Sequence, residues 1–462
     1  MSIDLSALWP HQLETYEFGK DQDALFDASD PGTGKTLAHI KLAENFLAEG
    51  GTRVVVTCPK TLVYSAWIDE FTKHAPTISV VAAEAPAENR KAAFESNAKV
   101  VIINIDGYKW LASRPLPWLK KQLGAKAMLI NDESHGLKNP SAMRTKAALK
   151  ISSLFVKKHC MSGTMAPNSV VELWSQAKIV DGGFRLGKSY SAFRNFMQIP
   201  IHKGPFINWV DKPEAAELVH GLLSDIMIRH EFDKVMPKVP RMDHNIVWYD
   251  LPKKHRKLYE ELESTSAIEH KGQLISAINA ASLAGKLLQC ASGAVYHDSG
   301  AKDKEWSILD TGRYELIADL AEGRDHSLIF FLWRHQRIAI ENELKKRGMS
   351  YAIIDGTVKS ASVRREIIAE FQAGKFRSIL IHPQSGAHGI TLTKAATIIV
   401  ASPVYEADKY KQMTARIRRG TQDQVTESIV VMARNTRDEK AYEVFVGKRD
   451  RLDALNNLFE GA

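Results

Sequence analysis

The sequence predicts an α/β protein with two lobes, each a mostly parallel sheet with helices on both faces. The first observation is a set of short β-branched runs that end in polar residues, "TRVVVTCP", "AKVVIINI" and "AKAMLINDES". The second is a later block of the same kind, "SLIFFLWRH", "SYAIIDG", "FRSILIHP" and "ATIIVASP". Helical stretches separate these runs, and apolar runs of this length between helices are typical of buried parallel strands. Two such blocks in 462 residues indicate two lobes.

The remaining chain is expected to be mainly helical. We expect a first lobe at about 1–240 and a second at about 241–462, with the crossing between them at the prolines of "MPKVPRM". The first lobe is predicted to hold a helical insertion at about 175–228, where the strand pattern stops. The second lobe is predicted to hold a helical segment at about 252–305, a core at about 310–445 and an amphipathic C-terminal helix that runs to the last residue.

Charge and composition favour a polyanionic partner, although a merely basic surface is the alternative. The formal net charge is +8, and basic side chains that neutralise phosphates release counterions. No apolar run reaches ~18 residues and the start has no signal-like pattern, so no membrane partner is expected. Cys58, Cys160 and Cys290 are isolated, which predicts a reduced compartment and no structural zinc. We expect the cytoplasm of a bacterial or phage-infected cell, or the nucleus of a eukaryote.

The segment "SDPGTGKT", Ser29 to Thr36, predicts a phosphate-binding loop. It follows the apolar run "ALFDA" and precedes the helical pattern "LAHIKLAENFLAE", which is the strand–loop–helix context of such a loop. Glycines let backbone N–H groups surround phosphates, and the helix N-terminus adds partial positive charge. We expect Lys35 to reach the β- and γ-phosphates of ATP and the Thr36 hydroxyl to ligate Mg²⁺. The residues expected to bind the nucleotide here are Gly32, Thr33, Gly34, Lys35 and Thr36.

A pair of acidic residues in "MLINDESHGLKN" is predicted to complete a site for ATP hydrolysis. Asp132 and Glu133 close an apolar run, which places them at the carboxyl edge of the predicted sheet, where ligands bind in open α/β folds. We expect Asp132 to hold the Mg²⁺ and Glu133 to polarise the attacking water. An acid pair after a strand is usually only the polar start of a loop. Its place downstream of a phosphate-binding loop favours a centre for ATP hydrolysis.

These motifs resemble those of the Swi/Snf-type double-stranded-DNA translocases within superfamily two of the helicases, and the resemblance runs in order along nearly the whole chain. "WPHQ" resembles the family's adenine-recognition element, which implies that Gln12 reads the adenine. "VVVTCPKTLVYSAWIDEF" resembles the next motif and implies that Pro59 and Lys60 contact a DNA phosphate. The phosphate loop fits the looser superfamily-two form, because Ser29 stands where the strict form has glycine.

Two further motifs of the first lobe carry over. "DESHGLKN" is close to the family's signature, and "MSGTMAPNSVVELWSQ" resembles its "TGTPxxN…ELW" element, with a methionine in place of the usual proline. The resemblance implies that His135 couples the nucleotide state to Ser162, Gly163 and Thr164. It also implies that Asn168 contacts DNA.

The crossing segment and the second lobe supply the remaining elements. "IMIRHEFDKVMPKVP" resembles the segment that crosses between lobes, and "YAIIDGTVKSASVRREIIAEFQ" resembles the family's "IDGSTxxxxRxxxIxxF". "SGAHGITLTKA" resembles "GGxGLNLTxA", which implies DNA-backbone contacts by Gly389, Thr391 and Thr393.

The stretch "QMTARIRRGTQ" matches the family's QxxxRxxR pattern at Gln412, Arg416 and Arg419, with glycine arriving one residue early at Gly420. Phosphoryl transfer spreads negative charge over the γ-oxygens, and a planar guanidinium stabilises that charge. We expect Arg416 and Arg419 to be catalytic arginine fingers and Gln412 to couple them to the nucleotide, while Arg418 is assigned to the surface.

The resemblance implies two RecA-like lobes that hydrolyse ATP in the cleft between them and move along double-stranded or branched DNA through sequence-independent phosphate contacts. The "DESHGLKNPSAMRTKAALKI" run favours the annealing-helicase branch, which acts at forks in DNA repair. A bare motor of this size suits a bacterial or phage protein, monomeric and with protein partners unidentified. The alternatives are a conventional strand-separating helicase of superfamily two and an ATP-switched nucleic-acid clamp; the intact motifs argue against the clamp.

Overall fold

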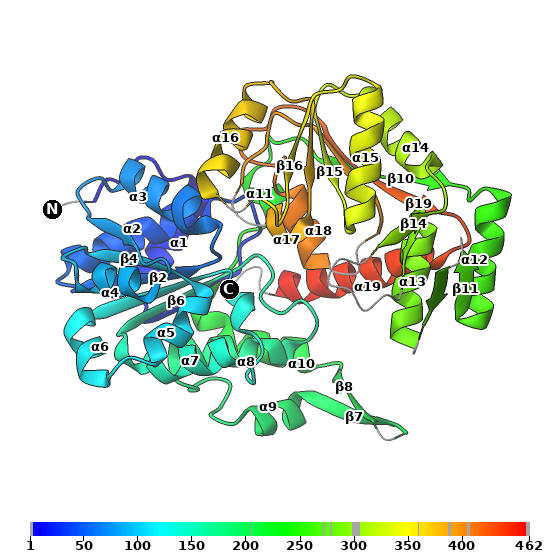
Figure 1. Cartoon of the computed structure of the whole chain (residues 1–462). Coiled ribbons are helices and arrows are strands. Elements are labelled where there is room, and N and C mark those ends of the chain that lie inside the picture. The colour runs from blue at the N-terminus through cyan, green and yellow to red at the C-terminus, as the bar shows by residue number, and fades with distance from the viewer. Residues whose placement is uncertain are drawn as a thin grey trace. The chain divides into compact units, whose positions relative to one another are not determined.

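The computed structural model describes residues 3–204, 206–270, 273–277, 280–297, 305–358, 360–386, 390–403 and 407–458. The chain divides into two compact units, the first of Met1–Pro237 with Asp450–Ala462 and the second of Lys238–Arg449. Each unit has its own parallel sheet with helices packed against it (Figure 1). The predicted fold class, two α/β lobes, is confirmed.

Unit 1 is organised around a seven-stranded sheet in the order β3-β4-β2-β5-β6-β1-β9, with every neighbouring pair parallel. The strands are β1 (Ala24–Asp27), β2 (Arg53–Cys58), β3 (Val80–Ala82), β4 (Val100–Asn104), β5 (Ala127–Asp132), β6 (Lys157–Met161) and β9 (Met227–Ile228). Its helices are α1 (Pro10–Gly19), α2 (Lys35–Ala48), α3 (Asp69–His74), α4 (Ala87–Glu95), α5 (Tyr108–Ala112), α6 (Leu116–Leu123), α7 (Met143–Ile151), α8 (Leu173–Asp181), α9 (Tyr190–Met197), α10 (Ala215–Leu223) and α11 (Phe232–Val235).

Both faces of this sheet are buried, which explains why its strands read as continuous apolar runs. Val54 and Val56 pack into a cluster with Phe46 of α2, while Val55 packs into a second cluster with Tyr108 of α5. Successive side chains of a strand point to opposite faces, so a strand covered on both sides is apolar at most of its positions.

The insertion expected to be helical at about 175–228 contains α8, α9 and α10, but it also contains a two-stranded antiparallel hairpin. Strands β7 (Gln198–Lys203) and β8 (Phe206–Asp211) form it, and the sequence pattern did not predict it. Pro200 interrupts the alternation of the first strand, and a proline within a run argues against a strand unless the strand lies at an edge. Both strands of a hairpin are edges, so the proline is tolerated here.

Unit 2 has a six-stranded sheet in the order β10-β19-β18-β15-β17-β16, again with all neighbouring pairs parallel. Its strands are β10 (Met242–Tyr249), β15 (Ser327–Phe330), β16 (Tyr351–Ile354), β17 (Ser378–Ile381), β18 (Thr397–Val400) and β19 (Thr426–Ala433). Its helices are α12 (Lys253–Thr265), α13 (Ala280–Ala291), α14 (Gly312–Glu322), α15 (Arg334–Lys346), α16 (Ala361–Gln372), α17 (Pro383–Gly386), α18 (Ala407–Thr414) and the part of α19 (Arg437–Leu458) that ends at Arg449. The segment expected to be helical at about 252–305 also holds two small hairpins, of β11 (Ala267–His270) with β12 (Gln273–Ser276) and of β13 (Ala294–Tyr296) with β14 (Trp306–Ile308).

The same alternation builds the core of unit 2. Ile329 and Leu380 pack with residues of α14 and α15 on one face, whereas Leu328 and Phe330 pack with Phe371 of α16 on the other. Over the residues that the structure describes, no helix combines the length and apolarity needed to cross a membrane.

A buried ion pair ties the core of unit 2 together. Arg313 and Asp438 are both fully buried, and Arg313 Nη1 donates to Asp438 Oδ2 at 2.7 Å. The same guanidinium donates to the carbonyls of Ala401, Ala291 and Val431, so it links four segments of the unit. Removing one partner of such a pair leaves an uncompensated charge in a low-dielectric interior.

We predict that Asp438→Ala lowers the free energy of unfolding of unit 2 by about 3–5 kcal/mol, because Arg313 stays buried without its counter-ion. Urea denaturation of the wild type and the variant measures the loss. Asp319→Ala is the matched control, since Asp319 pairs with Arg347 at 2.8 Å but its side chain is 64% exposed. The control should change stability by only about 0–1 kcal/mol, and an equal effect of the two variants would contradict the prediction.

Candidate active site

Parallel pairing around β6 brings three functional loops to one edge of the unit 1 sheet. Strand β6 pairs with β1 on one side and β5 on the other, and both Asp27 and Asp132 lie opposite Met161 in register. The chain leaves β1 for the phosphate loop, β5 for the acid pair and β6 for the segment Ser162–Thr164. Because these strands are parallel, all three loops leave at the same, carboxyl edge.

The phosphate loop has the backbone that its sequence predicts. Gly32 and Gly34 have φ values of 97° and 78°, a conformation that glycine adopts without strain. Helix α2 begins at Lys35, whose Nζ donates to the carbonyls of Ser29 at 2.7 Å and Asp30 at 3.1 Å. Thr36 lies in the first turn of α2. A glycine-rich turn, an ammonium group and a helix N-terminus at one place suit the phosphates of a nucleotide.

Gln12 is held directly against this loop. Its Nε2 donates to the carbonyls of Gly34 at 3.0 Å and Thr33 at 3.3 Å, and its Oε1 accepts from the backbone N of Trp9 at 2.9 Å. A Cβ added to Gly34 would lie 2.3 Å from Gln12 Nε2, so the close approach requires glycine. The indole of Trp9 is 41% exposed beside Gly34. Trp9 was not predicted as a site residue, although it lies directly before the helix that carries Gln12.

A second anchor of the loop comes from the chain after β9. Asp30 forms an ion pair with Arg229, whose Nη1 lies 3.3 Å from Asp30 Oδ1, and its Oδ2 accepts from the backbone N of Phe232 at 3.1 Å. Arg229 also donates to the carbonyl of Ala28 at 3.1 Å. The phosphate loop is therefore anchored by a segment that follows it in the sequence, as well as by Gln12, which precedes it.

Asp27 supports the loop from within the core. Its Oδ1 accepts from the backbone N of Ser29 at 3.0 Å, and its Oδ2 lies 3.3 Å from His39 Nε2. Burial works to raise the pKa of Asp27, but the hydrogen bond and charge of His39, with Lys35, lower it to about 2. Burial lowers the pKa of the neighbouring His159 well below its usual range. Asp27 is therefore an ionised structural anchor.

Asp132 is the opposite case. It is buried, its Oδ2 accepts from Trp67 Nε1 at 2.9 Å and its Oδ1 accepts from the backbone N of Glu133 at 2.9 Å. Burial and the negative charge of Glu133 raise its pKa to about 7, against the opposing effects of Trp67 and Lys35. Such a carboxylate favours a bound cation, which would compensate its charge. Trp67 was not predicted, because nothing in the sequence relates it to Asp132.

Glu133 lies at the centre of a small polar cluster. Its backbone has a φ of 52°, which is uncommon for a residue other than glycine and is found at functional turns. Ser162 Oγ donates to Glu133 Oε2 at 3.2 Å, and His135 Nδ1 lies 3.0 Å from Ser162 Oγ and 3.3 Å from Glu133 Oε2. The structure thus places His135 in contact with the Ser162 segment, as the expected coupling requires.

The Ser162–Thr164 segment also lies against the phosphate loop. A Cβ added to Gly163 would stand 2.5 Å from Pro31 Cδ, so only glycine fits between the two loops. Among the described residues, the buried Thr164 Oγ1 has no hydrogen-bond partner. Met165, which replaces the family's usual proline, packs in the core, and its carbonyl accepts from Gln176 Nε2 at 2.8 Å. The turn is held by these contacts without the proline.

The side chains of this site suit Mg²⁺ better than a metal ion that needs all its ligands from the protein. Within the described parts of the chain, no group of three or more His, Cys, Asp or Glu side chains could hold a metal ion. Mg²⁺ is typically held by one or two protein oxygens together with water and substrate phosphates. Asp132 and the hydroxyl of Thr36 are the protein oxygens that the motifs assign to such an ion.

The residues expected to contact DNA lie at loop positions. Lys60 is exposed and Pro59 partly exposed at the end of β2. Asn168 is exposed, and its Nδ2 donates to Glu172 Oε1 at 2.9 Å. In unit 2, Thr391 is exposed and the carbonyl of Thr393 accepts from Gln422 Nε2 at 3.1 Å; Gly389 lies outside the described residues.

The arginine-rich stretch of unit 2 begins at the end of α18. Arg416 is buried, and its guanidinium donates to the carbonyls of Gln412 at 2.7 Å and Ile390 at 3.1 Å. The backbone carbonyl of Arg416 accepts from Leu392 N at 2.9 Å, which joins the arginine to the segment expected to contact DNA. Arg418 Nε donates to the carbonyl of Pro240 at 3.3 Å, and Arg419 is partly buried.

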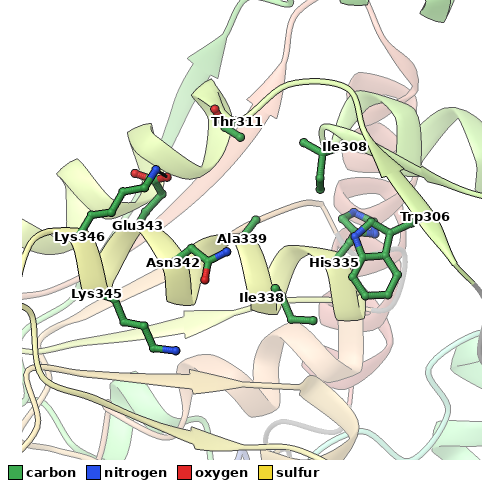
Figure 2. Close-up of a pocket in the computed structure, with 10 residues that line it drawn as sticks. All are labelled: Trp306, Ile308, Thr311, His335, Ile338, Ala339, Asn342, Glu343, Lys345 and Lys346. Carbon is green, nitrogen blue, oxygen red and sulfur yellow. Dashed lines mark hydrogen bonds and ion pairs between the residues drawn. The ribbon is translucent and has the colours of Figure 1, made fainter. Parts of the chain in front are cut away.

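A separate pocket of about 520 Å³ lies in unit 2 between β14 and α15. Figure 2 shows Trp306 and His335 at one end and Glu343, Lys345 and Lys346 at the other. None of its ten lining residues belongs to the predicted site.

Comparison with known proteins finds two family models that match this chain. Residues 21–292 match the model of the SNF2-related domain, and residues 312–421 match that of the helicase conserved C-terminal domain. The first of these covers more than half of the chain.

Relatives extend over nearly the full length. The protein p41 of Acyrthosiphon pisum secondary endosymbiont phage 1 is 28% identical over 448 residues, which are 92% of this chain and 92% of that protein. An uncharacterized ATP-dependent helicase of Mycoplasma pneumoniae is 26% identical over 96% of this chain but only 40% of that protein. The helicase Lhr of Mycobacterium smegmatis, solved with single-stranded DNA and AMP-PNP, has a TM-score of 0.57 at 13% identity, covering 98% of this chain and 48% of Lhr. That likeness shows the fold.

We predict that Asp132→Asn raises the melting temperature of the metal-free protein, and that the gain grows from about pH 5 to about pH 8. The folded state keeps the Asp132 proton up to about pH 7, whereas the unfolded state loses it near 3.8, so the wild-type carboxyl costs stability increasingly as the pH rises through this window. Thermal melts with a chelator measure the gain. Asp27→Asn is the control: because the pKa of Asp27 is lowered to about 2, this variant should lose stability equally at both pH values. A pH-independent gain for Asp132→Asn would contradict the prediction.

We predict that Gly163→Ala weakens binding of a fluorescent ATP analogue by at least about tenfold, because the new methyl group displaces Pro31 and with it the phosphate loop. Gly221→Ala is the matched control, since a Cβ there meets nothing within 4 Å in α10. The control should keep its affinity and gain about 0.5–1 kcal/mol of stability. Unchanged affinity in Gly163→Ala would show that the two loops are not in contact.

Proposed function

Because the chain belongs to the SNF2-related domain family, we propose that it is an ATP-driven motor that moves along double-stranded DNA. Membership of this family, with a helicase C-terminal domain, makes the chain a helicase-like ATPase. The ATP-hydrolysing part of the proposal rests on the meeting of Lys35, the Asp132–Glu133 pair and Ser162 at one sheet edge. The DNA part rests on the family membership and the net charge of +8.

Each group at this edge has a chemical task in the proposal. Lys35 and the backbone N–H groups of the loop hold the phosphates of ATP, and Gln12, already bound to the loop, reads the adenine. Glu133 polarises the attacking water, with its carboxylate oriented by Ser162 and His135. Mg²⁺, held by Asp132 and Thr36, would neutralise charge on the phosphates.

The positive charge for the transition state is assigned to Arg416 and Arg419 of unit 2. A guanidinium is always charged and matches the geometry of phosphate oxygens, so it stabilises the charge that develops during phosphoryl transfer. Arg416 Nε donates to the backbone carbonyl of Gln412, and this hydrogen bond fixes the direction of the Arg416 side chain.

DNA is proposed to bind through its phosphates. The net charge of +8 favours this, and the contacts assigned to Pro59, Lys60, Asn168, Gly389, Thr391 and Thr393 carry no sequence information. The contact of Ser162 with Glu133 joins the hydrolytic carboxylate to the segment that continues to Asn168. One ATP cycle is expected to advance the motor by about one base pair, ~3.4 Å.

We propose that the motor also acts on forked or branched DNA and that it takes part in DNA repair. The motor is proposed to act as a monomer in a bacterial or phage-infected cell. The phage relative p41, which matches this chain over almost its entire length, supports the phage setting.

We predict that duplex or forked DNA raises the steady-state ATPase rate by at least about tenfold over the rate without nucleic acid, and that the stimulation falls steeply with salt. Single-stranded DNA and RNA are the comparison arms of the assay. Arg416→Ala should lower the stimulated rate by at least about 10²-fold, because the transition-state charge is left uncompensated.

Arg418→Ala is the matched control for that variant, because Arg418 is the neighbouring arginine and its Nε donates to a backbone carbonyl. It should keep the stimulated rate within about threefold. Stimulation by single-stranded DNA or RNA alone would contradict the proposal and favour a conventional strand-separating helicase.

A further inference from the structure

Among the described residues, Trp67 is the largest side chain with no exposed surface. It packs in the core cluster of Val56 and Ile130, and its ring centre lies 6.1 Å from that of Phe71 in α3. A buried tryptophan usually finds a hydrogen-bond partner for its N–H group. The partner here is the carboxylate of the active site, because Trp67 Nε1 donates to Asp132 Oδ2 at 2.9 Å.

Trp67 reaches Asp132 from the connection between β2 and α3. Strands β2 and β5 are neighbours, with Thr57 opposite Asn131 in register, and Thr57 Oγ1 donates to Asn131 Oδ1 at 2.9 Å. The chain that leaves β2 therefore starts beside the end of β5 that carries Asp132. It then forms a π-helical turn, Val63–Ile68, before α3 begins. Such turns are rare and are frequently found at functional sites.

Two hydrogen bonds fix the plane of the Asp132 carboxylate. Its Oδ2 accepts from Trp67, and its Oδ1 accepts from the backbone N of Glu133 at 2.9 Å, so a rotation of the carboxylate would break both bonds. An ionised carboxylate has about four lone-pair sites on its two oxygens, and these bonds use one on each oxygen. The remaining sites stay available for a cation.

The indole is the main constraint on this orientation. Within the described parts of the chain, Trp67 is the one side chain that hydrogen-bonds to Asp132. Without the indole N–H, the carboxylate would keep only the backbone N of the next residue, Glu133. Glu133 itself is held by other groups, Ser162 and His135, which do not contact Asp132.

We propose that Trp67 is a positioning residue for the magnesium site. Its N–H group holds the Asp132 carboxylate in the orientation in which that side chain would bind Mg²⁺, and the packed ring keeps the N–H group in place. Hydrogen-bond partners of this kind orient the ligands of a metal, and their removal typically costs about 10–100-fold in metal affinity or activity. The inference rests on the proposed ATP-hydrolysing function, and it adds a residue that acts only through Asp132.

The test measures the binding of Mn²⁺ to the full chain by electron paramagnetic resonance, with the protein in excess over ADP. Mn²⁺ is the probe because it suits the same oxygen ligands as Mg²⁺. Trp67→Phe keeps a buried ring but removes the N–H group, and it should weaken Mn²⁺ binding by at least about tenfold. The affinity for ADP in the presence of a chelator should stay within about twofold of the wild type.

Two other tryptophans of unit 1 supply matched controls. Trp174 is buried and its Nε1 donates to the carbonyl of Gly187 at 3.0 Å, so Trp174→Phe also removes a hydrogen bond. Trp110 is buried and, over the residues that the structure describes, its Nε1 has no hydrogen-bond partner. Trp174→Phe and Trp110→Phe should lower the melting temperature as Trp67→Phe does, but they should leave the Mn²⁺ affinity within about twofold of the wild type.

Steady-state ATPase rates at increasing Mg²⁺ concentrations give a second measurement. In Trp67→Phe, the Mg²⁺ concentration for half of the maximal rate should rise at least about tenfold. The rate at saturating Mg²⁺ should recover to within about threefold of the wild type. Adding Trp67→Phe to Asp132→Asn should cause no further loss of Mn²⁺ affinity, because the indole acts through the carboxylate.

Three results would overturn the role of Trp67. They are an Mn²⁺ affinity of Trp67→Phe equal to that of the wild type, an equal loss of affinity in Trp174→Phe, and an additive loss in the double variant. A lower rate at saturating Mg²⁺ with an unchanged Mg²⁺ dependence would also overturn it, since packing alone would then explain the effect. Absence of both ATPase activity and Mn²⁺ binding in the wild type would instead overturn the proposed function, so the two failures are distinguishable.

Discussion

The parallel pairing of β6 with both β1 and β5 is the constraint on which the active edge depends. It sets Asp27, Met161 and Asp132 in one row, so the three loops that follow begin side by side. A slip of one residue in either pairing would turn every side chain of that strand to the other face of the sheet. The contacts beyond the row, such as Ser162 with Glu133, exist because this register holds.

Two aspartates of this row show how environment divides their roles. Both are buried, yet the pKa of Asp27 is lowered to about 2 and that of Asp132 is raised to about 7. Asp27 has His39 and the backbone N of Ser29 as partners, so its charge is compensated within the protein. Asp132 has Trp67 and a backbone N–H, but Glu133 adds a second negative charge beside it. The negative charge of the Asp132–Glu133 pair is only partly compensated by its protein partners, so the site favours a bound cation with a nucleotide.

Much of the fold could be predicted from the sequence, because strands covered on both faces are continuous apolar runs. Strands such as β2, β5 and β15 were predicted on this basis. Strand β6 was not, since "KKHCM" begins with two lysines and contains His159, whose burial beside His39 no local pattern reveals. Lys35, Asp132 and Glu133 were predicted from their strand–loop contexts, whereas Gln12, His135 and Ser162 were predicted from the resemblance to the family's motifs. Trp67 and the hydrogen bond from Ser169 to Asp211 were not, because these contacts join segments far apart in sequence.

Movement along an intact duplex is the central claim, and release of a third DNA strand tests it most directly. A labelled oligonucleotide is bound in the major groove of a blunt duplex at increasing distances from the end, and its release is followed after ATP is added. The account predicts release with ATP but not with a non-hydrolysable analogue, after a lag that grows in proportion to distance, while the duplex strands stay paired. Release without hydrolysis, a lag independent of distance, or no release despite DNA-stimulated ATPase activity would contradict it.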